Sequence, residues 1–249
     1  MSVIVTGASG QLGRLVIEEL LATVPASEVT ALVRDPAKVA DLAARGVAVA
    51  VADYNSPESL DGLLRAGDRV LLISGNEFHR DRTAQHKAVL DAAVKAGAAL
   101  FAYTSVLGSA GGPVTADHRA TEDAVRASGI PYSLLRNGLY HEMVTVNIPA
   151  ALEHGALVRA TGEGRLASAS RADYAAAAAA VLSGGGHEDT VYELSGAGLP
   201  DPLPHVMAGI DASIAAGEFA TVTGDLSRLP GRPTTPVAEA IGAALAGQQ

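Results

Sequence analysis

Short runs of apolar residues alternate with longer amphipathic stretches through the first half of the chain. Residues 3–5 form a short β-branched run, and after it Leu12, Val16 and Leu20 recur at helical spacing. The short runs are continuously apolar, which is typical of parallel strands covered on both faces. The pattern predicts strands at 3–5, 29–33, 47–52, 69–74, 99–105 and 132–136, and helices at 11–23, 36–45, 56–65, 82–96 and 116–128. This alternation predicts an α/β fold with a doubly wound parallel sheet of the Rossmann type.

The rhythm changes after residue 137. The later pattern predicts helices at 141–153, with an interruption at Pro149, and at 171–182, 203–216 and 236–246, and a strand at 190–194. We therefore expect a nucleotide-binding domain over 1–140 and a small C-terminal α/β lobe over 141–249. A stretch at about 165–196 should return to the main sheet. The lobe is expected to cover the carboxyl ends of the strands and to bind substrate.

Composition excludes several classes of function. With 48% hydrophobic residues, the 249-residue chain can bury a full core and is not disordered. Its formal charge of −9 argues against nonspecific binding to nucleic acid or anionic membranes. The absence of cysteine excludes disulfides, thiol catalysis and Cys-ligated metals. The histidine spacing predicts no metal site, and no G-x-S-x-G or P-loop motif is present.

The sequence carries no targeting or membrane signal. The N-terminus lacks the basic start and long apolar stretch of a signal peptide, and no apolar run approaches the roughly 18 residues of a membrane span. We expect a soluble, cytoplasmic protein acting on a small molecule. A homodimer is an expectation from the fold class alone.

The clearest motif is T-G-A-S-G-Q-L-G, residues 6–13, which reads G-x-x-G-x-x-G between the first strand and the first helix. Glycines there allow a tight turn and a close approach of the backbone to a pyrophosphate, while the helix N-terminus favours the anion. The alternative is a glycine cluster that serves only turning and packing. The strand–turn–helix context favours dinucleotide binding.

The end of the second strand bears on the choice of dinucleotide. Arg34 ends that strand, and Lys38 follows one helical turn later, which favours the 2′-phosphate of NADP(H). NAD is the alternative coenzyme, because the Asp35 carboxylate could bind the ribose hydroxyls. The alternative for Arg34 is a solvated surface residue. Asp53, at the end of the third strand, either meets the adenine or caps a turn.

Ten stretches resemble the NmrA-like atypical short-chain dehydrogenases, and within them the type-2 NAD(P)H:quinone oxidoreductases. They are TGASGQLGRLVIEELL (6–21), VRDPAK (33–38), VADYNSPESL (51–60), LLIS (71–74), AYTSVL (102–107), LLRNGLYHE (134–142), PAALEHG (149–155), ASRADYAAAAAAVL (169–182), VYELSG (191–196) and GRPTTPVAEA (231–240). The resemblance spans nearly the whole chain. It implies an NADPH-binding domain, a small C-terminal lobe, and hydride transfer to a quinone or a related conjugated carbonyl.

Carried over by motif, the resemblance also implies a set of site residues. Arg171 of the SRADY motif is a candidate pocket or lobe-anchoring residue, or it forms an internal ion pair with Asp173 or Glu142. Together with Asp53, the candidate cofactor-binding residues are Thr6, Gly7, Ser9, Gly10, Gln11, Leu12, Arg34, Ser74, Gly75, Asn76, Thr104, Asn137, Leu139 and Glu142.

The sequence departs from the family pattern around the substrate. Leu139 stands where these quinone reductases commonly have Trp, so an aromatic wall is missing. The loop 75–80 differs from the usual small polar run, and 108–115 is slightly short. The stretch 194–201 joins two motifs that relatives separate by several dozen residues, so a helix–strand–helix portion of the lobe is expected to be absent. We therefore predict a shortened C-terminal lobe.

The usual acid of short-chain dehydrogenases is absent, because no tyrosine is followed four residues later by lysine. His118 is nearest to the expected lysine position. It could bind the nicotinamide ribose, but a helix-surface histidine paired with Glu122 fits the i,i+4 spacing better. Reduction of a quinone gives a phenol-like anion that water can protonate, so the absence fits quinones better than isolated ketones.

Tyr140 and Asn137 are the candidate catalytic residues, as hydrogen-bond donors on the substrate side. A packing tyrosine is the alternative for Tyr140. Two other functions stay open for the whole chain: a non-catalytic NADP(H)-sensing regulator, and a reductase or isomerase of a specialised pathway with a reshaped pocket.

Overall fold

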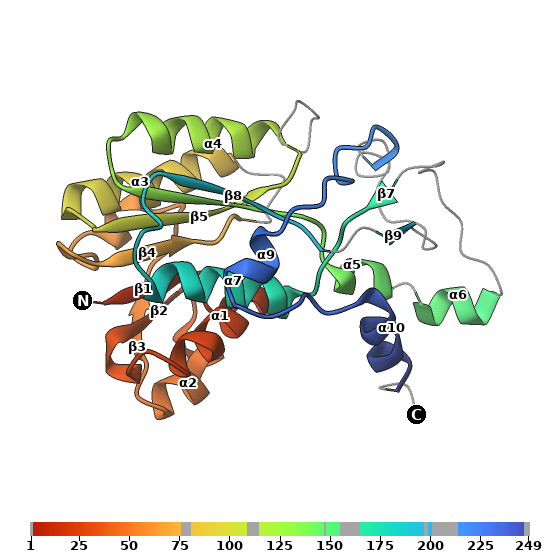
Figure 1. Ribbon diagram of the computed structural model, residues 1–249. Coiled ribbons are helices and arrows are strands. Elements are labelled where there is room, and N and C mark those ends of the chain that lie inside the picture. Colours follow the sequence, from red (N-terminus) through yellow and green to blue (C-terminus); the bar gives the residue numbers. More distant parts are fainter. Residues whose placement is uncertain are drawn as a thin grey trace. The chain divides into compact units, whose positions relative to one another are not determined.

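A seven-stranded sheet organises the protein, with the strand order β3-β2-β1-β4-β5-β6-β8 (Figure 1). The computed structural model describes residues 2–75, 81–108, 115–146, 148–154, 165–196, 199–200 and 214–246. The sheet strands are β1 (Val3–Thr6), β2 (Val29–Val33), β3 (Ala48–Val51), β4 (Arg69–Leu72), β5 (Leu100–Val106), β6 (Tyr132–Asn137) and β8 (Thr190–Leu194). The pairs β1–β2, β2–β3, β1–β4 and β4–β5 are parallel. The predicted doubly wound α/β fold is confirmed.

Helices cover both faces of this sheet. Figure 1 shows α3 and α4 on one face and α1 and α7 on the other. Their bounds are α1 (Gln11–Leu21), α3 (Arg82–Ala96), α4 (Ala116–Ala127) and α7 (Arg171–Ser183), and the short helix α2 covers Ala40–Ala44. In α1 the predicted apolar stripe of Leu12, Val16 and Leu20 is buried, and Ile17 is buried beside it. On the other face, Val89 and Leu90 of α3 pack with Phe101 of β5 in one apolar cluster.

The strand order determines where a ligand can bind. From β1 the chain runs outward through β2 to β3, and it then crosses back to place β4 on the other side of β1. In an open α/β sheet, a crevice forms at the carboxyl ends of the two strands that flank such a reversal. Here these strands are β1 and β4, so the segments after Thr6 and after Leu72 line the crevice.

Two helices predicted in the first half of the chain differ in the structure. The stretch 56–65 forms only a 3₁₀ turn at Pro57–Leu60, because Gly62 adopts φ +73° and interrupts any helix there. The stretch 36–45 is divided into a 3₁₀ turn, Pro36–Val39, and the helix α2. A further 3₁₀ turn covers Ala26–Glu28. Most of the predicted helix 203–216 lies outside the described residues.

The chain divides into two compact units. The first comprises Met1–Ser105, Asp117–Leu135 and Ala175–Tyr192, and the second comprises Val106–Ala116, Arg136–Tyr174 and Glu193–Gln249. The second unit contains α5 (His141–Thr145), α6 (Ile148–His154), the strands β7 (Arg165–Leu166) and β9 (Leu199–Pro200), which pair antiparallel, α9 (Asp225–Arg228) and α10 (Val237–Ala246). The stretch 141–153, predicted as one helix with an interruption at Pro149, forms the two helices α5 and α6. The predicted place of the interruption is wrong, because Pro149 lies in the first turn of α6, where proline is tolerated.

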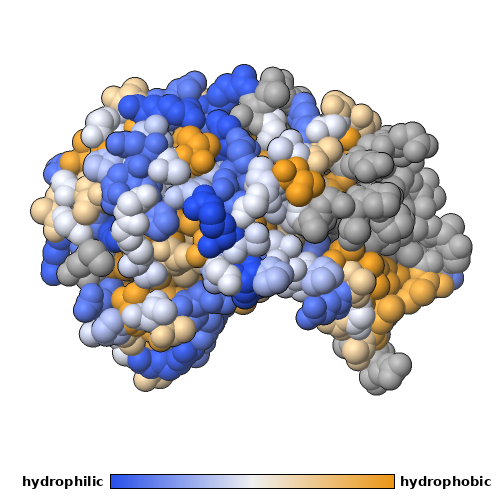
Figure 2. Space-filling model, in the orientation of Figure 1, coloured by the Kyte–Doolittle hydropathy of each residue, from blue (hydrophilic) through white to orange (hydrophobic). Residues whose placement is uncertain are grey.

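The second unit exposes apolar side chains. Val146, Leu152 of α6 and Leu245 of α10 are all exposed, and α10 packs against α5. An apolar area gathers over α5, α6 and α10 at the lower right of Figure 2. Among the described residues, no helix is long and apolar enough to cross a membrane.

Candidate active site

The glycine motif forms a tight cradle between β1 and α1. Gly7 adopts φ +60°, which side-chain-bearing residues rarely adopt. Gly13 lies against the turn so closely that a Cβ there would meet the Gly7 carbonyl oxygen at 2.5 Å and the Ala8 Cα at 2.8 Å. The loop therefore requires glycine at two of its three motif positions, one for conformation and one for space.

The start of α1 leaves its backbone donors available. Its N-cap is Gly10, so among the described residues no side chain caps the helix, and no acidic residue lies in its first turn. The first backbone N–H groups of a helix lack partners within it, and they attract anions together with the helix dipole. With the cradle, this arrangement fits the pyrophosphate of a dinucleotide.

Hydroxyl groups of β1 and β5 hold the segment after β4 in place. The Ile73 N–H donates to Thr6 Oγ1 at 3.0 Å, and the Ser74 N–H donates to Thr104 Oγ1 at 2.9 Å. Thr6 and Thr104 are buried. Two of the predicted site residues, Thr6 and Thr104, thus support backbone that lines the crevice, and a third, Ser74, belongs to that backbone.

The two candidates for coenzyme choice at the end of β2 have different surroundings. The Asp35 carboxylate accepts the Ala37 N–H at 3.0 Å and so caps the 3₁₀ turn at Pro36–Val39. Arg34 is exposed at the end of the strand. Asp35 Oδ1 thus serves the turn, and the contact of Arg34 with the ribose end of a dinucleotide stays a prediction.

The end of β3 contributes a turn and a tyrosine. Asp53 Oδ1 accepts from the backbone N–H and the side-chain amide of Asn55 at 2.9 and 2.8 Å, which is the turn-capping arrangement. The sequence analysis did not single out Tyr54. Its hydroxyl is buried without a hydrogen-bond partner among the described residues, 4.0 Å from the position that a Cβ of Gly7 would take. Burial raises the pKa of Tyr54 to about 12, and the charge of Arg34 opposes the rise.

Tyr54 therefore places an unpaired donor at the glycine cradle. Buried polar groups are rarely left unpaired in native proteins, so such a group is expected to bind a ligand. In the sequence, Tyr54 directly follows Asp53 at the carboxyl end of a predicted strand, and this position could have indicated a ligand-binding residue.

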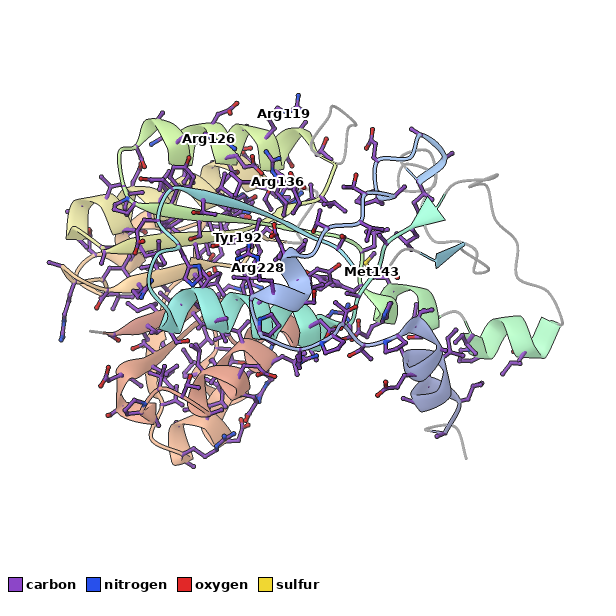
Figure 3. All side chains as sticks on the ribbon, viewed as in Figure 1. Arg119, Arg126, Arg136, Met143, Tyr192 and Arg228 are labelled. Carbon is purple, nitrogen blue, oxygen red and sulfur yellow. The ribbon has the colours of Figure 1, made fainter. Side chains whose placement is uncertain are left out.

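The predicted surface position of His118 is wrong. Its side chain is buried with 8% exposure, whereas Arg119 lies on the exposed side of the same helix (Figure 3). Its Nε2 lies 3.1 Å from the Arg82 guanidinium and its Nδ1 lies 2.8 Å from the Tyr103 hydroxyl. Burial, followed by the charge of Arg82, lowers the pKa of His118 to about 4. Both ring nitrogens have protein partners, so the structure does not support a contact between His118 and the nicotinamide ribose.

In the second unit, β6 ends at Asn137, whose Oδ1 is buried without a hydrogen-bond partner among the described residues. The next residue, Gly138, has no room for a side chain, because a Cβ there would meet the Tyr174 hydroxyl at 2.9 Å. The preceding Arg136, labelled in Figure 3, pairs with Glu193 at 2.6 Å. Leu139 packs on an apolar cluster of Leu107, Leu166, Ile214 and Phe219.

Tyr140 lies in an aromatic and cationic setting. Its ring meets the Tyr174 ring edge-on at a centroid distance of 5.3 Å, and the Arg171 guanidinium carbon lies 4.8 Å from the centroid of the Tyr140 ring. Burial raises the pKa of the Tyr140 hydroxyl, although Asn137 and the Arg171 charge oppose the rise. The Glu142 carboxylate accepts the Arg171 N–H at 3.1 Å and pairs with its guanidinium at 3.6 Å. The predicted Arg171–Glu142 ion pair is confirmed.

A buried carboxylate connects two motifs of the second unit that are distant in sequence. Asp173 accepts from Ser170 Oγ at 2.8 Å, from the Thr235 N–H at 2.8 Å and from the Arg232 guanidinium at 2.5 Å. Burial alone would raise the pKa of Asp173, but these hydrogen bonds and the arginine charge outweigh it and lower the pKa. The predicted alternative of an Arg171–Asp173 pair gives way to the pairing with Arg232.

The predicted site residues divide between the two units. The first unit contains Thr6, Gly7, Ser9, Gly10, Gln11, Leu12, Arg34, Asp53, Ser74, Gly75 and Thr104, and the second contains Asn137, Leu139, Tyr140 and Glu142. Asn76 lies outside the described residues. Among the described residues, no group of three or more His, Asp or Glu side chains could hold a metal ion.

Comparison with known proteins supports this geometry. A family model described as NAD(P)H-binding matches residues 7–184, which is more than half of the chain. The chain belongs to this NAD(P)H-binding family. The match covers the glycine cradle, Arg34 and the segments after β4, β5 and β6, so the predicted dinucleotide-binding fold is confirmed and the cradle fits its cofactor.

Two curated relatives and two solved structures match nearly the whole chain. Quinone oxidoreductase 2 of Escherichia coli (strain K12) is 41% identical, with 95% of this chain and 96% of the relative covered. A crystal structure of the Escherichia coli NADPH-dependent quinone oxidoreductase with NADPH has a TM-score of 0.91 at 39% identity, with 98% and 99% of the chains covered. A Citrobacter sp. triphenylmethane reductase complexed with NADP(H) has a TM-score of 0.90 at 35% identity, with 98% and 100% covered. An NAD(P)H azoreductase of Xenophilus azovorans is 29% identical, with 95% of this chain and 76% of the relative covered.

The alignment with quinone oxidoreductase 2 is 276 positions long, whereas this chain has 249 residues. At least 27 positions of that alignment therefore lie opposite gaps in this chain. The chain is thus shorter than this relative within the aligned region, and the shortened C-terminal lobe stays a prediction.

Proposed function

We propose that this protein is an NADPH-dependent oxidoreductase that transfers hydride to a quinone or a related conjugated acceptor. The observation that carries the proposal is the identity of 41% with quinone oxidoreductase 2 across nearly the full length of both chains. The relatives named as azoreductase and triphenylmethane reductase act on other conjugated acceptors. Their common feature is that an extended π system can spread the charge of the added hydride.

The choice of NADPH rests on the end of β2. Arg34 is exposed there, while Asp35 Oδ1 is used by the turn at Ala37. A guanidinium can bind a 2′-phosphate through two hydrogen bonds, whereas a carboxylate would repel it. Arg34→Ala should raise the Kd for NADPH at least tenfold and leave the Kd for NADH nearly unchanged. Arg45→Ala, which removes an exposed arginine paired with Glu18, is the matched control. Equal effects on the two coenzymes would contradict the assignment.

The residues of the second unit suggest how the acceptor is handled. Bound NADPH supplies the hydride, and the product of its addition to a quinone is a hydroquinone anion with a pKa near ~10, as for a phenol. Burial raises the pKa of the Tyr140 hydroxyl, which favours its protonated form as a hydrogen-bond donor. We therefore assign to Tyr140 and Asn137 hydrogen-bond donation to the acceptor oxygen, and to water the final protonation. No step requires the missing tyrosine–lysine pair or His118.

The decisive experiment is stopped-flow mixing of the protein with NADPH and a panel of quinones, followed by absorbance at the nicotinamide band. Rapid oxidation that depends on the quinone is expected. Tyr140→Phe should lower kcat with at most a small change in the Kd for NADPH. Tyr192→Phe, which removes a buried hydroxyl paired with His187, should leave kcat unchanged.

An NADP(H)-sensing regulator is the second candidate. The observation in its favour is that His118, the residue nearest to the usual lysine position, is bound at both nitrogens by the protein. Tight NADPH binding with no oxidation by any acceptor would support the regulator and would exclude the reductase.

The assembly and location remain predictions. Exposed apolar side chains of α6 and α10 support a homodimer, which light scattering after size-exclusion chromatography would detect. A cytoplasmic location would be tested by fractionation of cells.

A further inference from the structure

The two peptide bonds that flank Gly75 are held from both sides by buried side chains of α3. The Gly75 N–H donates to His86 Nε2 at 3.1 Å, and the Gly75 carbonyl oxygen accepts from Arg82 Nε at 2.8 Å. His86 is fully buried and Arg82 is 4% exposed. Glycine loses more conformational freedom on ordering than any other residue, so a segment at this position needs such restraints to stay in one conformation.

The hydrogen bonds determine the tautomer of His86. The Gly75 N–H can only donate, so Nε2 of His86 must carry a lone pair. The Thr121 hydroxyl donates to the Asp117 carbonyl at 2.8 Å, which leaves it to accept from His86 Nδ1 at 2.9 Å. His86 is therefore a neutral imidazole protonated at Nδ1.

The same argument applies to His118. Arginine can only donate, so Nε2 of His118 accepts from Arg82, and its Nδ1–H donates to the Tyr103 hydroxyl at 2.8 Å. Arg82 thus contacts both the Gly75 carbonyl and His118, and its charge is balanced by Asp117 at 3.4 Å. Helices α3 and α4 and strand β5 all contribute to a buried network whose outer end is Gly75.

Gly75 lies where this network can influence a ligand. It follows β4 by three residues, at the carboxyl end of a strand that flanks the reversal of strand order. Ile73, two residues earlier, lies 3.5 Å from the position that a Cβ of Gly7 would take, and its N–H is held by Thr6. The backbone at 73–75 therefore continues the wall that begins with the glycine cradle.

We propose that His86 and Arg82 are positioning residues for the dinucleotide: they fix the Gly75 peptide bonds so that this backbone forms a preorganised wall of the cofactor site. Preorganisation raises affinity because the loop does not have to be ordered when the cofactor binds. The inference rests on the proposed function, since it assumes that this crevice binds NADPH. Neither residue contacts the cofactor in this role; each acts through the backbone of Gly75.

The test compares His86→Leu, His86→Gln and Tyr103→Phe. Leucine removes the acceptor for the Gly75 N–H, whereas glutamine keeps a side-chain oxygen acceptor at about the position of Nε2. Tyr103→Phe is the matched control, because it removes a buried hydroxyl of the same network and leaves both bonds to Gly75 in place. The measurements are the Kd for NADPH by calorimetry and the Tm of each cofactor-free protein.

His86→Leu should raise the Kd for NADPH about tenfold or more, which corresponds to the loss of one buried hydrogen bond. The Kd of His86→Gln should stay within about threefold of the wild-type value. Tyr103→Phe should lower the Tm without changing the Kd. An unchanged Kd in His86→Leu would overturn the proposal. An equal loss of affinity in Tyr103→Phe would also overturn it, because lower protein stability would then explain the weaker binding. If the wild-type protein itself fails to bind NADPH, the proposed function fails, which is a separate outcome.

Should His86→Leu fail to fold, nitrogen-15 NMR of the wild-type protein provides the decision. His86 and His118 should both be neutral and protonated at Nδ1, and the Gly75 amide should exchange slowly with solvent before NADPH is added. An Nε2-protonated His86, or a Gly75 amide that becomes protected only with NADPH, would overturn the proposal.

Discussion

Two buried neutral histidines make the stability of the first unit sensitive to acid. Burial, followed by the charges of Arg82 and His118, lowers the pKa of His86 to about 3, and burial lowers the pKa of His118 to about 4. In the unfolded chain each imidazole has a pKa of about 6.5. The unfolded state therefore binds more protons than the folded state between about pH 6.5 and 4, and the free energy of unfolding falls as the pH falls through that window. The groups that face the two imidazoles are the Gly75 N–H, Arg82 on α3, Tyr103 on β5, and Thr121 and Glu122 on α4. Asp117 pairs with Arg82.

The size of the effect follows from these values. Between pH 7 and pH 5, proton binding stabilises an unfolded histidine by about 2 kcal/mol, while a folded group with a pKa of 3 or 4 gains almost nothing. The two residues together should lower the free energy of unfolding by about 4 kcal/mol. Small proteins are stable by only about 5–15 kcal/mol, so this loss is easily measured.

The assay is urea unfolding followed by circular dichroism at pH 7 and pH 5, with linear extrapolation to water. In His86→Leu the loss between the two pH values should shrink by about 2 kcal/mol, because one titrating group is gone. Lys87→Met changes the next residue of the helix, which is exposed and paired with Asp91, and it should keep the full loss. If His86→Leu and the wild-type protein lose the same stability, His86 is not buried in its neutral form and the tautomer argument for Gly75 fails with it.

Three further predictions address the cradle, the unpaired tyrosine and the second unit. Gly13→Ala should abolish NADPH binding measured by calorimetry, because its Cβ would meet backbone at 2.5 Å; Gly185→Ala, where the space is open, should bind normally. Tyr54→Phe should raise the Kd for NADPH several-fold and leave the Tm of the cofactor-free protein unchanged or higher. A lower Tm with an unchanged Kd would contradict the hypothesis that the Tyr54 hydroxyl donates to a ligand. Asp173→Asn should lower the free energy of unfolding by about 2–3 kcal/mol, since the carboxylate is buried and binds Arg232, and a urea titration showing less than about 0.5 kcal/mol would contradict this.

Much of the fold could be predicted because the relevant signals are local. The helix 82–96 and the strand 190–194 were predicted at the bounds that the structure shows, since apolar spacing and a following glycine or turn define each of them. The stretch 56–65 was predicted wrongly because a helical pattern continues through Gly62, whose positive φ appears only in the folded turn.

The candidate site also contains parts that local sequence predicts and parts that depend on distant contacts. The glycine cradle could be predicted because its three glycines lie within seven residues and its function depends on the backbone alone. The roles of Tyr54 and His118 could not be predicted, because burial decides the first, and burial with partners on α3 and β5 decides the second. The i,i+4 spacing of His118 and Glu122 is equally compatible with a surface pair and with a buried network.

The sequence by itself therefore determined the doubly wound sheet, the dinucleotide cradle and the family, because periodicity, glycine spacing and motif order are properties of the chain read in one dimension. Only the tertiary structure decided that His86 and His118 are buried and neutral, that Arg82 and His86 hold Gly75, and that Asp173 pairs with Arg232. These contacts join residues between 7 and 59 positions apart, and their protonation states depend on burial. Neither distance nor desolvation is encoded at any single position, so both emerge only when the helices pack on the sheet.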